Sequence, residues 1–178
     1  KILFINWMDS ANPQAGGAEA YLTEIAERLF KQGHDVSLLC SNYRVHTGYA
    51  RKEIEKNGVK IFRVGNRWTF PLFMPFKLRK LDKKYDFDVI AEDVNKVPIL
   101  SFLFHKKPVL LMVMHLWGKA IYSQTNIVFG TAVFLLEQLI RLYKRFEVQT
   151  ISKSSKKELV SLGFKPERVK VIEPGVSL

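Results

Sequence analysis

The first 33 residues set the strongest constraint on the fold, because they have the pattern of a buried strand, a glycine turn and an amphipathic helix. Residues 2–5 form a short apolar run rich in strand-forming side chains. A loop follows and ends at Gly16 and Gly17. From Tyr21 to Phe30 apolar residues recur at helical spacing, and Gly33 is placed to end the helix. The chain therefore begins with a strand, a turn and a helix.

Gly16 and Gly17 lie where an anion would find free backbone amides. The first turn of a helix has N–H groups without internal acceptors, and the aligned peptide dipoles make this end positive. Two residues without Cβ atoms let a ligand approach these amides. The pattern predicts a phosphate or diphosphate site at Gly16 and Gly17. The alternative is that the glycines only form a tight turn, with Glu19 complementing the helix dipole.

The strong positive charge points to an anionic partner. The chain has 28 Lys and Arg against 17 Asp and Glu, a net charge of +11. Such a charge balance suits a phosphate-bearing substrate, an acidic membrane surface or nucleic acid as the partner.

The length of 178 residues suits one domain, residues 1–178, and no apolar run approaches the roughly 20 residues of a membrane span. Cys40 is the single cysteine, which excludes an internal disulfide, and its apolar surroundings predict a buried thiol.

The stretch from Trp68 to Lys84 combines aromatic and basic residues around two prolines. Pro71 and Pro75 are expected to prevent a regular helix there, so that a helix begins only after Pro75 and runs from 76 to 85. Aromatic side chains beside cations favour docking on an anionic membrane surface. The alternative is that the aromatic side chains pack on the core and only the cations face solvent.

Strand patterns alternate with helical ones along the whole chain. Val59 to Val64 alternates apolar and basic residues, as expected of a half-exposed or edge strand. Residues 49–57 suit a short charged helix or an extended connection, and 119–146 a long helical region. The strands are expected at 2–5, 36–40, 59–64, 89–91, 109–114, 147–151 and 169–172. This alternation predicts a Rossmann-like, doubly wound and mostly parallel sheet in a three-layer α/β/α arrangement.

Polar residues follow several of these strands, at the edge where such sheets bind ligands. Gly16 and Gly17 follow the first strand, Glu92 and Asp93 end the fourth, and His115 ends the fifth. Groups at equivalent ends of separate strands favour one shared site. The alternatives are that His115 is a core imidazole bonded to backbone, and that Glu92 and Asp93 cap a helix.

Three other kinds of site do not match the sequence. The dinucleotide fingerprint is absent, since no third glycine follows Gly17 at the required spacing and no acidic residue ends the second strand. No Gly-Lys-Ser/Thr triplet of a P-loop exists. The four histidines are far apart and lack ligand spacing, so no metal is expected.

The ordered set of motifs resembles the N-terminal domain of family 4 glycosyltransferases, the large retaining group with the GT-B fold. The tail departs slightly, since this chain has Glu173, Pro174 and Gly175 where the family usually has Pro-Asn-Gly. The resemblance covers essentially the whole chain, and its matching segments are 16–19 (GGAE), 33–36 (GHDV), 88–90 (DVI), His115, 151–152 (IS) and 171–176 (VIEPGV).

The resemblance implies a sugar-transferring enzyme of which this chain is the acceptor-side half, inactive by itself. A second Rossmann-like domain, expected after residue 178, would carry most of the contacts to the nucleotide sugar. Gly16 and Gly17 would face the donor diphosphate, and His115 would be the catalytic residue beside the transferred sugar. The acceptor, a saccharide or a lipid-linked molecule, would contact Glu92, Asp93 and Trp117. No cofactor is implied, and the expected location is the cytoplasm, at the inner face of a membrane.

A different class of function also fits the residues. The chain would then be a non-catalytic module that binds an acidic membrane or another polyanion through the cations of residues 68–84 and 141–170. Nucleic acid is not expected as a partner, because the basic stretches lack a recognition motif.

Overall fold

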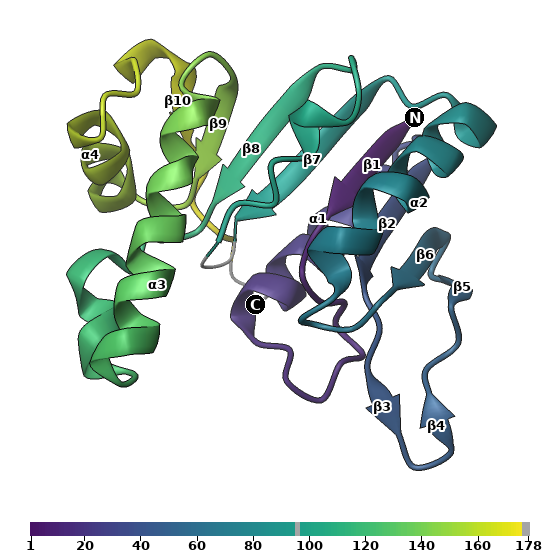
Figure 1. The fold of residues 1–178 in the computed structure, drawn as a ribbon. Helices are drawn as coiled ribbons and strands as arrows, with labels where there is room; N and C mark the ends of the chain where they lie inside the picture. Colours follow the sequence, from purple (N-terminus) through teal and green to yellow (C-terminus); the bar gives the residue numbers. More distant parts are fainter. Residues whose placement is uncertain (95–96, 176–178) are drawn as a thin grey trace. The chain divides into compact units, whose positions relative to one another are not determined.

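A computed structural model of the chain describes residues 1–94 and 97–175. Figure 1 shows strands joined by helices along this part of the chain. The chain divides into a first unit, residues 1–92 and 100–109, and a second unit, residues 93–99 and 110–178.

The first unit contains a mostly parallel sheet (Figure 1). Its strands are β1 (Ile2–Ile5), β2 (Val36–Ser41), β5 (Glu53–Lys56), β6 (Val59–Val64) and β7 (Val89–Val94). They lie in the order β7-β1-β2-β6-β5, with all neighbours parallel except the pair β6 and β5. A separate antiparallel hairpin joins β3 (Arg44–Val45) and β4 (Gly48–Tyr49). The segment 49–57 is thus extended, which is one of its two predicted forms.

The strand β6 lies inside this sheet, although its alternating pattern predicted a half-exposed or edge strand. The chain turns back at Asn57 and Gly58, both in the left-handed region, and β5 pairs with the free side of β6. The edge position therefore belongs to β5, and Arg63 of β6 is only 3% exposed. A basic side chain so deeply buried needs an acidic partner.

Two helices cover this sheet, and the second corrects a prediction. α1 (Gly17–Lys31) and α2 (Phe70–Tyr85) both contact β2, which is buried along its whole length. α2 begins at Phe70, so the expectation that Pro71 and Pro75 prevent a helix there was wrong. Pro71 lies in the first turn, where its missing N–H would have no acceptor, and Pro75 removes a single bond within the helix. A short turn, η1 (Ser101–Leu103), completes the described helical segments of this unit.

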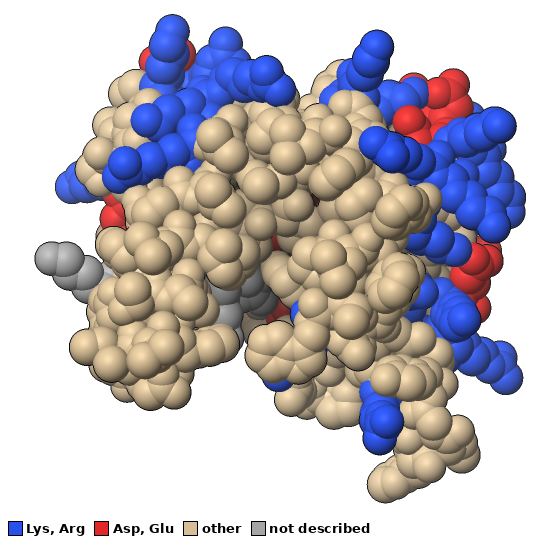
Figure 2. All heavy atoms as spheres, in the orientation of Figure 1, with Lys and Arg blue, Asp and Glu red and all other residues tan. Residues whose placement is uncertain are grey.

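The solvent side of α2 and the residues before it form a patch with an apolar and a basic half. The apolar half contains Trp68, Leu72, Phe73 and Phe76, which are 67%, 68%, 50% and 70% exposed. The basic half contains the exposed residues Arg79, Lys80, Lys83 and Lys84. Figure 2 shows Lys and Arg side chains gathered beside a broad uncharged face. Phe70 and Met74 are buried, so the aromatic stretch packs only partly on the core.

The second unit contains three parallel strands. They are β8 (Val109–Val113), β9 (Glu147–Thr150) and β10 (Val169–Val171), with β9 in the middle. Its helical segments are η2 (Gly118–Ser123), α3 (Ile127–Glu137), η3 (Gln138–Tyr143), α4 (Lys153–Ser161) and η4 (Pro166–Arg168). Of Lys119 only the main chain is described, and Val176 of the family-like tail lies outside the described residues.

The region predicted as one long helix from 119 to 146 is divided into three segments. Asn126 adopts an extended conformation, and its side chain accepts the N–H of Phe129 at 2.9 Å, which starts α3 as a new helix. Ser152 caps α4, because its hydroxyl accepts the N–H of Ser155 at 3.1 Å. The predicted fold class, a Rossmann-like and mostly parallel α/β fold, is confirmed.

Within the described residues, no helix has the length and apolar character needed to cross a membrane.

Candidate functional site

The glycine turn opens directly onto the start of α1, as the sequence predicted. Gly16 is the N-cap residue, and the first backbone bond of the helix joins the Ala20 N–H to the Gly16 carbonyl at 3.1 Å. The N–H groups of Gly17 and Ala18 therefore face out of the first turn without an acceptor in the helix. The Gly16 N–H is already bonded to the buried Glu19 carboxylate at 2.8 Å. Glu19 thus forms a capping bond, and phosphate binding at the amides of the next residues stays a prediction.

Neither the backbone conformation of Gly17 nor its described neighbours require a glycine at this position. It is exposed, it adopts a helical conformation, and a Cβ built on it meets no described atom within 4 Å. Open space at the Cβ position of Gly17 is what a ligand that approaches the backbone there would require.

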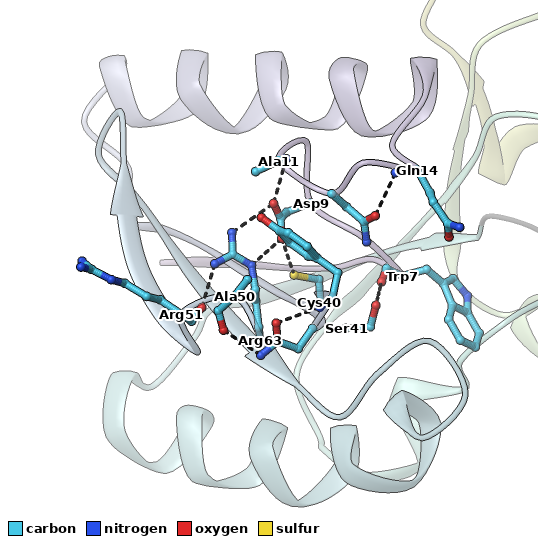
Figure 3. Close-up of polar contacts among 12 residues, drawn as sticks. Trp7, Asp9, Ala11, Gln14, Cys40, Ser41, Ala50, Arg51 and Arg63 are labelled. Atoms are coloured by element: carbon cyan, nitrogen blue, oxygen red, sulfur yellow. Dashed lines mark hydrogen bonds and ion pairs between the residues drawn. The ribbon is translucent and has the colours of Figure 1, made fainter. Parts of the chain in front are cut away.

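A buried charge cluster lies beneath this loop, and Figure 3 shows its side chains pointing toward one another between α1 and α2. The Arg63 guanidinium donates from Nε to Asp9 Oδ2 at 2.7 Å and from Nη2 to Asp9 Oδ1 at 3.1 Å. Its Nη1 donates to the carbonyl of Arg51 at 2.8 Å. The Cys40 thiol donates to Asp9 Oδ2 at 3.4 Å, and the Tyr43 ring lies 5.2 Å from the guanidinium.

The ion pair and the thiol shift one another's protonation. Burial raises the pKa of Asp9, but the hydrogen bonds from Arg63 and the Ala11 amide outweigh it and hold the pKa below its ordinary value. Burial, together with the nearby Asp9 charge, raises the pKa of Cys40 well above its ordinary value. Asp9 is therefore a carboxylate and Cys40 a neutral thiol at neutral pH. Cys40 is a buried free thiol, as predicted.

His115 lies in an exposed turn that follows β8 in the second unit. Its ring centroid is 5.2 Å from that of Trp117, with the planes tilted by 57°. The buried Glu137 of α3 accepts the N–H groups of Trp117 and Gly118 at 2.6 and 2.8 Å. On the other side of the turn, the Ser155 hydroxyl donates to the Met114 carbonyl at 3.2 Å. The exposed imidazole is thus carried by a tightly bonded turn.

Glu92 and Asp93 both lie at the end of β7 and are fully buried. The Glu92 carboxylate accepts the N–H groups of Leu100 and Ser101 at 3.2 and 2.9 Å, which caps the turn η1. This matches the capping alternative for Glu92. Contact of Glu92, Asp93 or Trp117 with an acceptor stays a prediction.

The structure brings together some of the predicted residues and leaves others in separate units. Gly16 and Gly17 adjoin at the start of α1 in the first unit, and His115 and Trp117 adjoin in the second. Glu92 belongs to the first unit and Asp93 to the second. That the glycines and His115 share one cleft therefore stays a prediction. In the described part of the chain, no group of three or more His, Cys, Asp or Glu is arranged to hold a metal.

Sequence reasoning missed Asp9, Arg63 and Glu137, which organise the two loops. Arg63 lies in the run predicted as a half-exposed or edge strand and Glu137 in the predicted long helical region, yet both are 3% exposed. The only sequence signal for Arg63 was a cation inside an otherwise apolar strand run. Such a residue is worth pairing with an acidic residue in a loop after a neighbouring strand.

The fold and these loops define a class: a Rossmann-like α/β protein with polar groups after its parallel strands and a glycine turn at the start of its first helix. The sequence model of Glycosyltransferase Family 4 matches residues 15–178, and the chain belongs to this family. The family predicted from the sequence motifs is thereby confirmed. A comparison with curated protein sequences gives no match.

Solved structures of GT-B glycosyltransferases share the fold. The chain is similar to sucrose-phosphate synthase from Thermosynechococcus elongatus, with a TM-score of 0.70 at 12% identity over 98% of this chain and 48% of that one. It is also similar to HepE from Anabaena, determined in complex with UDP-glucose, with a TM-score of 0.62 at 18% identity over 98% of this chain and 44% of that one. The chain thus spans about half the length of either protein.

Proposed function

We propose that the chain is the N-terminal, acceptor-side domain of a retaining glycosyltransferase that takes its sugar from a nucleotide sugar. The family match over residues 15–178 carries this proposal. The open space at the Cβ position of the exposed Gly17 supports a donor diphosphate at the start of α1. The chain covers under half of two similar structures, one of them holding UDP-glucose, which supports a second domain that binds most of the nucleotide.

The proposed reaction needs position and charge stabilisation from this chain, and no metal or other cofactor. The acceptor hydroxyl oxygen bonds to the anomeric carbon on the face from which the diphosphate leaves, so the configuration is retained. The bond from that carbon to the diphosphate oxygen breaks, and the leaving diphosphate takes the acceptor proton. The amides of Gly17 and Ala18 stabilise the growing phosphate charge, and His115 donates to a hydroxyl of the transferred sugar. Trp117, beside His115, offers an indole face to the acceptor sugar.

A transfer assay tests this function. The chain joined to its nucleotide-sugar domain is supplied with nucleotide sugars and candidate saccharide or lipid-linked acceptors, and the anomeric product is identified by NMR. We expect transfer with retention, and a loss of about a hundredfold or more in kcat for His115→Ala. His46→Ala is the matched control, since His46 is exposed in the hairpin loop. Equal rates for both variants would remove His115 from the mechanism, and inversion would exclude the retaining class.

A second proposal concerns location: the α2 patch docks on an anionic membrane surface. Its large apolar side chains Trp68, Leu72 and Phe76 are about two thirds exposed, and a row of cations adjoins them. Apolar side chains that enter the interface beside cations that meet anionic headgroups are the mark of an interfacial helix. Docking of this patch would bring the enzyme to the inner face of a membrane, near a lipid-linked acceptor.

Vesicle flotation tests the docking. We expect the chain to float with vesicles of mixed phosphatidylglycerol and phosphatidylcholine at low salt and less at high salt, and not with phosphatidylcholine alone. Leu72→Ser with Phe76→Ser should weaken flotation at both salt concentrations, because the apolar contribution is not screened. Salt-dependent binding to DNA of equal strength would favour a general polyanion surface instead.

A further inference from the structure

The loop between β1 and α1 is bonded along its length, and the bonds start from Asp9. The Asp9 carboxylate accepts the Ala11 N–H at 2.9 Å, and the Asp9 carbonyl accepts the Asn12 N–H at 3.1 Å. The Asn12 side chain accepts the Gln14 N–H at 3.0 Å, and its carbonyl accepts the Ala15 N–H at 2.8 Å. These hydrogen-bonded turns run from Asp9 to Ala15, the residue before Gly16, and so connect Asp9 to the start of α1.

Asp9 itself is fixed by a residue from the sheet. Arg63 of β6 holds both carboxylate oxygens in a two-bond fork, and the Arg51 carbonyl fixes the third nitrogen of the guanidinium. The pair is almost completely buried, with side-chain exposures of 2% for Arg63 and 1% for Asp9. A fork of this kind fixes distance and orientation together, which a packed apolar contact does not.

We infer that Asp9 and Arg63 are positioning residues that fix the Gly17 and Ala18 amides for the donor diphosphate. The inference rests on the proposed function and adds two residues to it that touch no substrate. A buried ion pair gives little net stability over an apolar pair of similar volume, so stability alone does not account for it. What the pair supplies is a defined place for the start of α1 relative to the sheet. Because transition-state contacts are sensitive to small displacements, a loop that drifts loses donor binding.

A paired apolar replacement separates positioning from stability. Arg63→Met alone leaves a buried unpaired carboxylate and is at risk of not folding, whereas Asp9→Leu with Arg63→Met fills the site without charge. In the enzyme that contains the nucleotide-sugar domain, we expect the double variant to keep the parent unfolding midpoint within a few degrees. Its KM for the donor should rise about ten- to hundredfold. Arg63→Lys, which keeps the charge and loses the fork, should raise the KM in the same direction.

Hydrogen exchange gives a readout that does not depend on transfer. In the double variant we expect faster exchange at the Ala11, Asn12, Gln14 and Ala15 amides, and unchanged exchange in β2. Arg28→Met is the control, because it breaks an exposed ion pair to Glu24 on α1 and should leave both KM and loop exchange unchanged.

The outcomes separate the two proposals. A parent enzyme without any sugar transfer overturns the proposed function and, with it, the donor role of this loop. An active parent whose folded double variant keeps the donor KM within twofold overturns the positioning role alone. A raised KM with faster loop exchange supports it.

Discussion

The loop after β1 and the turn after β8 are both held by a buried carboxylate, but in different ways. In the loop after β1, Asp9 accepts the amide of its own loop while Arg63 neutralises its charge. In the turn after β8, Glu137 reaches over from α3 and accepts the amides of Trp117 and Gly118. The first arrangement ties a loop to the sheet through an ion pair, and the second ties a turn to a helix through backbone amides. The ion pair is the more fragile to single substitution, because loss of one partner leaves a charge in a dry site.

The largest expected effect follows from this difference. Arg63→Met should lower the free energy of unfolding by about 3–5 kcal/mol, because the Asp9 carboxylate is left buried and unpaired. Urea unfolding followed by circular dichroism measures it. Adding Asp9→Leu should recover most of the loss. A single variant as stable as the parent would show that water reaches Asp9 and that the cluster is not the anchor we describe.

Loss of the Glu137 carboxylate should lower the free energy of unfolding by less than Arg63→Met does. Glu137→Ala leaves two backbone amides without their acceptor, and we expect a loss of about 1–3 kcal/mol in the same unfolding experiment. Glu137→Gln keeps one acceptor oxygen and should lie between the parent and the alanine variant. If Glu137→Ala costs more than Arg63→Met, the contrast between the two loops is wrong.

The strands could be predicted from the sequence, and the groups that hold the loops could not. Short apolar runs such as those at β1 and β8 indicate burial by composition alone. The Asp9 and Arg63 pair joins residues 54 positions apart, and its formation depends on the order of strands in the sheet. Which side of β6 is covered is decided by β5, and no local pattern of β6 reveals this.

Helix α2 shows the opposite kind of error, in which a local rule was applied too strongly. Proline inside a helix costs a hydrogen bond, but Pro71 falls in the first turn and Pro75 is buried together with Met74 and Leu78. The apolar contacts of this helix face outweigh one missing hydrogen bond.

At the candidate site, the glycine turn and the strand-end imidazole were predictable as local motifs. The carboxylates that fix them were not, because their partners are distant in sequence.

The acid dependence of stability should single out Asp9. The pKa of Asp9 is lowered in the folded protein, so its contribution is present above its unfolded pKa of about 3.9 and is lost as the pH falls through the folded value. Asp9→Asn should therefore lose stability at neutral pH and show a shallower decline of stability below about pH 4. Unfolding midpoints from pH 2 to 7 measure this effect. Parallel curves for the parent and the variant would contradict a charged Asp9 in the folded state.

Gly17→Ala tests the central claim most directly. The fold predicts no loss of stability for this variant, whereas the proposed function predicts weaker binding of the donor. Since Cβ space is open and the backbone is helical at Gly17, the free energy of unfolding should stay the same or rise by up to about 1 kcal/mol. A methyl group over the amide should nevertheless raise the donor KM about tenfold or more in the two-domain enzyme. Glu24→Ala, on the exposed side of α1, should leave the KM unchanged. A Gly17→Ala enzyme with the parent KM would contradict diphosphate binding at the start of α1.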